Sequence, residues 1–302
     1  MLDGLFSLFQ PNLPLHLLKG QEAGIDIHMF IDAVWRRFGV KPQLITPAEL
    51  RLLPDSRSTG GYRLCCISKD NGEATVPRTP PRFFTHNGEV LEEIHQVGLE
   101  LHQHELAALK PEMLRQLSLR CFNDMRTVLL VHDKRMLGIV RQEVSNMVAR
   151  HVLSPAQATA LRRGIVNTIL PNSPEMQSLL QSSRKSAHLR HEYILKPIRS
   201  GKGHGIVFGE DLGPSEWVAQ LERLQSEKLT LLASCVVQRR IVPCMYNMTL
   251  KSSRAVDNYN LVGTYHVANG QLLGLGIWRA SRDRIVAISS GALWICSVIR
   301  RE

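Results

Sequence analysis

The part of this 302-residue sequence best suited to chemistry is a lysine followed by a glycine-rich stretch. Residues 193–206 read YILKPIRSGKGHGI, an apolar strand that ends in Lys196 and is followed by glycines at 201, 203 and 205. Glycine lets a backbone approach a ligand and turn its N–H groups inward, and a lysine at a strand end supplies a cation for phosphate oxygens. The pattern favours an anion site, although tight turns also need glycine for steric reasons alone.

The charge of the chain favours an anionic partner. Arg199 and Lys202 add positive charge within the loop, and the whole chain has 37 basic against 27 acidic residues, a net charge of +10. Most of the basic residues are arginine, whose planar fork suits phosphate and carboxylate. A nucleotide, a nucleic acid or an acidic metabolite would fit, and so would a merely solvated basic surface. A Walker loop is excluded because no Gly-Lys-Ser/Thr opens a helix here.

The first part of the chain alternates strands and helices, which predicts a small parallel, Rossmann-like sheet. The hydrophobic pattern predicts strands at 15–20, 42–47 and 63–68 and helices at 25–38 and 48–53. No glycine fingerprint follows the first strand, so it is not interpreted as a dinucleotide site. Three prolines in 70–84 predict a loop, and a long helix is expected over 88–109.

Helices are expected to about residue 185, with Ser154 and Ser173 as N-caps, and strands dominate from residue 192. Ser215 is expected to cap a helix that ends near 225, and a strand is expected at 234–242. Asn269-Gly270 is the strongest hairpin signal in the chain. We therefore expect an α/β (α+β) protein whose second part is built on antiparallel sheets.

The sequence favours a cytoplasmic protein without a membrane segment. None of the six cysteines forms a C-x-x-C pair, so neither a zinc motif nor a disulfide framework is visible. The N-terminus has neither a basic leader nor a small-residue cleavage site. No stretch approaches the roughly 18 apolar residues that a membrane helix needs.

Several motifs resemble the nucleotide-binding half of the ATP-grasp ligases. These are Ile194-Leu195-Lys196-Pro197, the glycine loop, and a later strand in which Val237-Gln238 leads to Pro243. His132-Asp133-Lys134-Arg135-Met136-Leu137 resembles the segment that carries the second phosphate lysine of these enzymes. The order of the segments is most similar to the circularly permuted branch that includes glutathionylspermidine synthetase and eukaryotic glutathione synthetase. This resemblance extends from about residue 15 to the C-terminus, and it implies a Rossmann-like pre-ATP-grasp (lid) domain at 1–125 and an ATP-grasp domain at 126–302.

The resemblance also implies a binding site for ATP. Lys134 and Lys196 would hold the phosphates, and Arg279 would contact an anion; these three are the candidate catalytic residues. The flap over the phosphates would comprise Gly201, Lys202, Gly203 and Gly205, and the hinge beside adenine would comprise Gln238, Arg239 and Ile241. Other interpretations remain open: Lys134 could be a surface helix lysine, Gln238 and Arg239 an edge-strand polar pair, and Arg279 a surface base on a hairpin.

The implied reaction is ATP-dependent joining of a small-molecule carboxylate to an amine through an acyl phosphate, with Mg²⁺ as second cofactor. No metal ligands are identified. In the permuted branch they precede the lid domain, and Asp3, Asp257 and Asp283 do not fit the pattern. Either the ligands come from elsewhere or the chain is a shortened or inactive relative, and the alternative function is nucleotide binding without turnover. Nucleic-acid binding ranks last because the basic residues are spread out and no aromatic platform is visible.

Overall fold

A computed structural model of the chain describes residues 2–22, 24, 26–58, 60–68, 83–226, 235–250 and 255–297. The chain divides into two compact units, Met1–Val128 with His266–Gly274, and Leu129–Tyr265 with Leu275–Glu302. Parallel strands occur in the first unit and antiparallel sheets in both, so the expected mixed α/β class is confirmed. Within these described ranges, no helix has the length and apolar character needed to cross a membrane.

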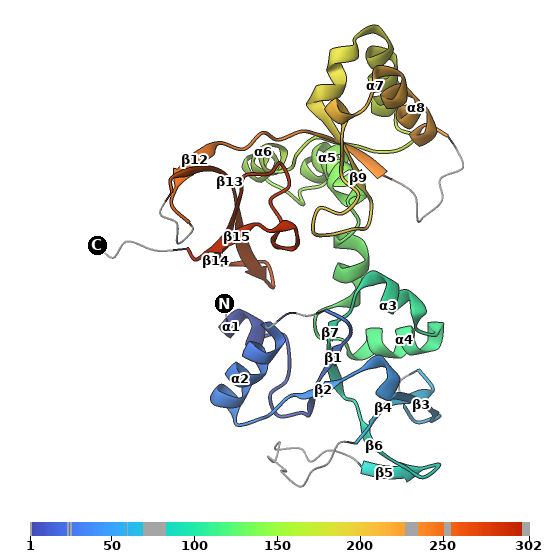
Figure 1. Cartoon of the computed structure of the whole chain (residues 1–302). Helices are drawn as coiled ribbons and strands as arrows, with labels where there is room; N and C mark the ends of the chain where they lie inside the picture. Colours follow the sequence, from blue (N-terminus) through green and yellow to red (C-terminus); the bar gives the residue numbers. More distant parts are fainter. Residues whose placement is uncertain are drawn as a thin grey trace. The chain divides into compact units, whose positions relative to one another are not determined.

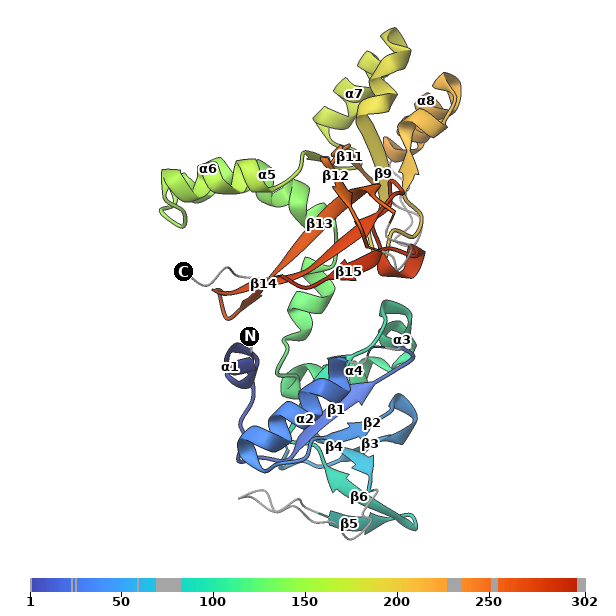
Figure 2. The same ribbon diagram turned by 60° about the vertical axis from the view of Figure 1, so that its left-hand side comes forward.

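The first unit contains a parallel sheet of order β2-β1-β7. Its strands are β1 (Leu15–Lys19), β2 (Gln43–Ile45) and β7 (Gln96–Glu100), and the helices of the unit are α1 (Leu2–Phe6), α2 (Asp26–Phe38), α3 (Gln103–Ala108) and α4 (Pro111–Arg120). Helix α2 lies along β1 and β2 (Figure 2). Leu15 of β1 and Val34 of α2 share a buried cluster with Phe9, so side chains alternate between this helix layer and the opposite face of the strand.

An antiparallel sheet of order β3-β4-β6-β5 completes the first unit. Its strands are β3 (Leu50–Pro54), β4 (Tyr62–Ile67), β5 (Phe83–His86) and β6 (Glu89–Glu93). The main core of the unit joins residues of both sheets, among them Leu18 and Ile45 from the parallel sheet and Leu64 and Cys66 from β4. The two sheets therefore bury a common apolar layer.

The structure corrects three predictions in the first part of the chain. The helix expected at 48–53 is a 3-10 turn, Pro47–Glu49, that leads into strand β3. The strand expected at 63–68 exists as β4 but belongs to the antiparallel sheet, and the third parallel strand is β7. The helix expected over 88–109 is instead β6, β7 and the short α3. Of the loop predicted at 70–84, residues 70–82 lie outside the described residues and the last two begin β5.

The second unit contains four helices, with strands between the last three of them, and ends in strands. The helices are α5 (Arg135–Ala149), α6 (Pro155–Gly164), α7 (Pro174–Lys185) and α8 (Pro214–Leu224). The two predicted serine caps are confirmed: Ser154 Oγ accepts from the backbone N–H of Gln157 at 3.2 Å, and Ser173 Oγ accepts from that of Met176 at 3.1 Å. The predicted Ser215 cap is wrong, because Gly213 is the N-cap and Pro214 takes the first helical position.

Two antiparallel sheets form the strand part of the second unit, apart from His266–Gly274 of one hairpin, which belong to the first unit. The first sheet has the order β10-β9-β11-β8 and the second the order β12-β13-β14-β15. The strands are β8 (Thr168–Ile169), β9 (Tyr193–Pro197), β10 (Val207–Phe208), β11 (Cys235–Arg239), β12 (Met245–Met248), β13 (Asp257–Ala268), β14 (Gln271–Ser281) and β15 (Leu293–Ile295). The predicted hairpin turn is confirmed, with φ of +49° at Asn269 and +74° at Gly270.

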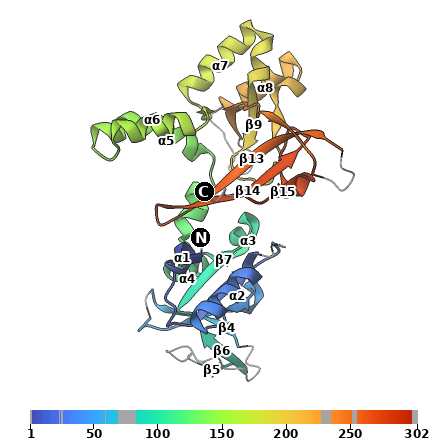
Figure 3. The same ribbon diagram turned by 90° about the vertical axis from the view of Figure 1, so that its left-hand side faces the viewer.

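Helices α7 and α8 pack against the first of these sheets. The two helices lie next to β9 in all three ribbon views (Figures 1, 2 and 3). Trp217 and Leu221 of α8 and Met176 of α7 form one buried cluster with Leu195 of β9 and Val237 of β11. This packing fixes the two central strands, β9 and β11, whose ends carry the candidate site. Short turns connect the elements: a π turn at Thr127–Val131 and 3-10 turns at Ala187–Glu192, Gly209–Asp211 and Ile288–Ser290.

Candidate functional site

A cavity of about 270 Å³ lies within the second unit, at strands β9, β10, β11 and β14. Seven of the residues expected from the sequence line this cavity, and they come from three segments that are distant along the chain. They are Lys196, Lys202, Gly203, Gln238, Arg239, Ile241 and Arg279. Lys134, Gly201 and Gly205 do not line the cavity.

Lys196 enters the cavity from the central strand β9, where it pairs in register with Val236 of β11. Its side chain is half-buried, and burial lowers its pKa from the usual value of a lysine. The strand is held in place on one side by the α7 and α8 helices. The ammonium group is therefore presented from a rigid element rather than from a loop.

Lys134 approaches the same segment from the residue before helix α5. Its backbone N–H donates to the carbonyl of Ile198 at 3.1 Å, and its Nζ donates to the carbonyl of Ser200 at 2.6 Å. Burial lowers the pKa of Lys134, and the charge of nearby Lys196 lowers it further. Two partly desolvated lysines that repel each other are stabilised by a bound anion, and such pairs are typical of functional sites.

Asp133 organises the arginines around Lys134. Its carboxylate accepts from Arg135 at 2.6 Å and lies 3.5 Å from Arg199 of the glycine loop. Burial alone would raise the pKa of Asp133, but the hydrogen bonds from the side chain and backbone of Arg135 outweigh burial and hold the pKa below its usual value. Asp133 thus stays a carboxylate that connects the start of α5 to the glycine loop.

In the glycine loop between β9 and β10, the backbone conformation requires glycine at some positions and not at others. Gly203 and Gly205 have φ of +81° and +70°, and a Cβ on Gly205 would lie 2.8 Å from Pro197 Cγ. Gly201 faces open space. The turn is closed by the N–H of His204, which donates to the carbonyl of Gly201 at 3.0 Å. The positive-φ positions favour glycine strongly, whereas position 201 tolerates a side chain.

The proposed hinge comprises the last two residues of β11 and the segment that follows them. Gln238 is 2% exposed, and its Nε2 donates to Thr168 Oγ1 of β8 at 2.9 Å, so its amide braces the sheet beside the cavity. Farther along, Ile241 is 70% exposed. Arg239 pairs with Glu192 at 3.1 Å. The segment therefore changes from buried strand to open edge across the mouth of the cavity.

Arg279 lines the cavity from strand β14, where it pairs in register with Trp294 of β15. Its side chain is half-buried, and its Nε is buried without a hydrogen-bond partner among the residues that the structure describes. An unsatisfied guanidinium nitrogen at a cavity wall is suited to an anionic ligand.

Two arginines and one aromatic ring that were not expected from the sequence also line the cavity, namely Arg240, Arg284 and Phe208. The guanidinium of Arg284 lies 4.1 Å from the ring centroid of Phe208, and that of Arg240 lies 5.5 Å from it. Glu210 and Asp211 fix Arg284, which donates to Glu210 at 2.6 Å and to Asp211 at 2.8 Å. Nothing in the spacing of these residues signals the cluster, because β10 and the segment after β14 meet only in the fold.

The magnesium ligands that the resemblance implies are not found in this cavity. Among the described residues that line it, none is an aspartate or a glutamate. Asp257 pairs with Arg282, and the backbone N–H of Asp283 donates to Ser281 Oγ at 3.1 Å. Mg²⁺ prefers carboxylate oxygens, so the described lining does not fit a magnesium ion.

Comparisons with known proteins found similarity along the whole of this chain. Residues 1–130 match a family model described as the AnkG N-terminal domain. The chain is 38% identical over 308 residues to the ATP-grasp enzyme ankG of Aspergillus thermomutatus, an alignment that covers 100% of this chain and 62% of the relative. This chain thus spans less than two thirds of the length of that relative.

Two weaker likenesses were also found. An uncharacterised protein of Mycobacterium leprae (strain TN) is 30% identical over 90 residues, which cover 30% of this chain and 16% of the relative. Among solved structures, the macrocyclase MdnC bound with precursor peptide MdnA, from Microcystis aeruginosa MRC, aligns with a TM-score of 0.44 and 13% identity over 95% of this chain and 79% of that one. The whole of this chain is thus similar to part of a protein that is named an ATP-grasp enzyme.

Proposed function

We propose that this chain binds ATP in the cavity of the second unit and acts as an ATP-grasp ligase that joins a carboxylate to an amine. In this proposal residues 1–125 form the pre-ATP-grasp domain and residues 126–302 the ATP-grasp domain. The observation that carries it is the convergence of Lys196, the glycine loop and the end of β11 on one cavity. The order of Lys134 and Lys196 along the chain supports the circularly permuted branch.

The basic side chains divide into two roles. Lys134 and Lys196 contact phosphate oxygens, which relieves the repulsion that lowers the pKa of Lys134. Arg279 contacts a further anionic group with the nitrogen that lacks a partner among the described residues. The exposed segment at Ile241 lies beside the base of the nucleotide. Positioning and electrostatic stabilisation supply most of the catalysis in phosphoryl transfer, so no protein nucleophile is required.

The proposed reaction has two steps. A carboxylate oxygen of a small-molecule substrate attacks the γ-phosphorus of ATP, the bond to the β-phosphate oxygen breaks, and an acyl phosphate and ADP form. The amine of the second substrate then attacks the acyl carbon, the C–O bond to phosphate breaks, and an amide, inorganic phosphate and a proton result. Lys196 and Arg279 hold the anionic groups in place during both steps.

A second candidate function is nucleotide binding without turnover. It is favoured by one observation, the lack of any carboxylate among the described residues that line the cavity. Phosphoryl transfer concentrates negative charge that a divalent cation usually neutralises. Turnover of ATP distinguishes the two functions.

The test combines binding and turnover in one series. The chain is titrated with ATP in a calorimeter and then incubated with ATP, Mg²⁺ and pooled amino acids and polyamines, and ADP, phosphate and product masses are measured. A ligase releases ADP and phosphate together and gives a product lighter by one water than the sum of its substrates. Binding without ADP under every condition supports the second function. No ATP binding, in a folded chain, contradicts both.

A further inference from the structure

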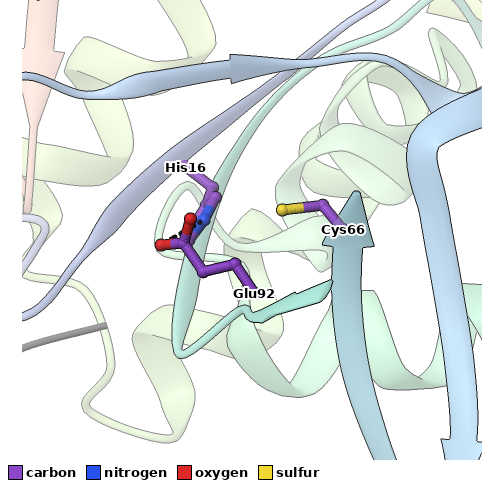
Figure 4. Close-up of side chains that lie close together, drawn as sticks. All are labelled: His16, Cys66 and Glu92. Atoms are coloured by element: carbon purple, nitrogen blue, oxygen red, sulfur yellow. Dashed lines mark ion pairs between the residues drawn. The ribbon is translucent and has the colours of Figure 1, made fainter. Parts of the chain in front are cut away.

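Three side chains that commonly bind metals meet inside the first unit. They are His16 of β1, Cys66 of β4 and Glu92 of β6, and their ligating atoms all lie within 4.8 Å of one another. Figure 4 shows the carboxylate of Glu92 beside the imidazole of His16, with the sulfur of Cys66 pointing toward both. Fifty residues separate His16 from Cys66, so no spacing motif in the sequence reveals the group.

The sheet registers explain why the three side chains meet. Cys66 and Glu92 are direct partners across the antiparallel pair of β4 and β6, so their side chains leave the sheet on the same face. His16 lies on β1 of the parallel sheet, where its register partner on the neighbouring strand β2 is Gln43. The face of β1 that carries Leu18 packs on the face of β4 that carries Cys66, in one core. The group is therefore held by strands from two sheets.

The surroundings of the group are buried and largely apolar. His16 and Glu92 are fully buried, and Leu64 and Ile94 line the same layer. Neither ring nitrogen of His16 nor Oε1 of Glu92 has a hydrogen-bond partner in the described part of the chain, although His16 Nε2 and Glu92 Oε1 are 3.3 Å apart. Native cores rarely leave buried polar groups unsatisfied, and an unexplained group of this kind points to a missing ion or ligand.

The donor set suits a divalent cation of the zinc class. Imidazole, thiolate and carboxylate are the ordinary zinc ligands, and a mixed nitrogen, sulfur and oxygen set disfavours Mg²⁺ and Ca²⁺. Donors on one tetrahedral zinc lie roughly 3.3–3.8 Å apart, given bond lengths of about 2.0–2.3 Å. His16 and Glu92 already have that spacing, and the sulfur needs to move by about 1 Å or less.

Charge and outer contacts agree with this assignment. One thiolate and one carboxylate cancel the two positive charges of the ion, which leaves a neutral centre in the core. Gln43 Nε2 donates to Glu92 Oε2 at 2.6 Å, the kind of second contact that orients a ligating carboxylate. Binding the ion releases the Cys66 thiol proton to solvent, and because the donors are buried, the ion enters as the unit folds.

We propose that His16, Cys66 and Glu92 bind one zinc-class divalent cation that joins the two sheets of the first unit. The three side chains supply three of the four donors of a tetrahedral ion, and a water molecule enclosed as the unit folds supplies the fourth. The ion joins the two sheets, and the site is independent of the proposed nucleotide function.

The test uses the full chain with Cys244 and Cys296, the exposed thiols, replaced by serine. The chain is unfolded in chelator and refolded with Zn²⁺, with Co²⁺ or with chelator alone. We expect one bound ion per chain after dialysis, a thiolate-to-cobalt charge-transfer absorption, and a higher Tm with zinc than with chelator. X-ray absorption at the zinc edge should show one sulfur among the ligands. A metal-free refolded chain, or zinc bound only to nitrogen and oxygen, would refute the proposal.

The adjacent cysteine provides a matched control. Cys65 is equally buried, but its register partner is Glu93 and it lies on the opposite face of β4. We expect Cys66→Ser to lose the charge-transfer absorption and to bind zinc at least about tenfold more weakly, while Cys65→Ser keeps the absorption. Equal absorption in the two folded variants would also overturn the proposal. If Cys66→Ser does not fold, the X-ray absorption of the chain with Cys66 intact decides.

Discussion

Replacing Lys196 with alanine should weaken ATP binding while leaving the fold at least as stable. The side chain presents a partly desolvated ammonium group close to that of Lys134. Loss of a charge-assisted hydrogen bond to phosphate costs about 1.5–3 kcal/mol, or roughly 10- to 150-fold in Kd. Without ATP, the change removes a repulsion and a burial cost, so the free energy of unfolding should not fall. Binding and stability are thus expected to respond in opposite directions.

The assay is a calorimetric titration with ATP, paired with urea unfolding of the same preparation. Lys185→Ala is the control, because this exposed lysine ends helix α7 in the same unit and does not line the cavity. It should leave the Kd unchanged. Two results would refute the reasoning: an unchanged Kd in Lys196→Ala, or a loss of stability that accounts for the weaker binding.

Three further predictions concern pH, the glycine loop and the core of the second unit. The affinity for ATP should be highest at pH values below the lowered pKa values of Lys134 and Lys196. It should fall as the pH rises through those pKa values, which lie below the ordinary lysine value of 10.5. Titrations in two buffers of different ionisation enthalpy should detect the protons taken up on binding. Over the same window the stability of the ATP-free chain should rise, since the unfolded lysines hold more protons, and urea unfolding at several pH values measures this. Gly205→Ala should lower the free energy of unfolding by about 1–2 kcal/mol, because φ at Gly205 is +70° and Pro197 lies close. Gly201 faces open space, so Gly201→Ala should change the free energy of unfolding by less than about 0.5 kcal/mol. Equal effects of the two substitutions would contradict the loop geometry. Trp217→Phe should cost about 1–3 kcal/mol in urea unfolding, because Nε1 of this buried side chain donates to Ser183 Oγ at 3.1 Å.

Local patterns predicted the elements whose signals are local. The caps at Ser154 and Ser173, the first strand and the Asn269-Gly270 turn were predictable because capping and turn chemistry depend on neighbouring residues. The error at 88–109 has a physical cause. Leu91, Ile94 and Val97 recur at helical spacing and are all buried. Leu91 is instead buried in β6, which pairs with β4, and Val97 in β7, which pairs with β1.

The site was predictable only in part, for the same reason. Lys196 and the glycine loop are contiguous and carry their own signal, and seven of the expected residues line the cavity. Arg284 and Phe208 meet across 76 residues of chain, a distance that no spacing rule reaches. The group of His16, Cys66 and Glu92 depends on the register of two sheets, which a single sequence does not specify.

The central strand of the parallel sheet, β1, pairs with a strand that is synthesised much later, β7. Leu15 pairs with Gln96, so β1 gains its second neighbour only after about 80 further residues have been added. At a synthesis rate of about 5–20 residues per second, the ribosome needs roughly 4–16 s to deliver that neighbour. Throughout this interval one edge of β1 presents unpaired backbone groups to the crowded cell. We therefore expect fragments that stop short of β7 to aggregate more readily than the whole chain.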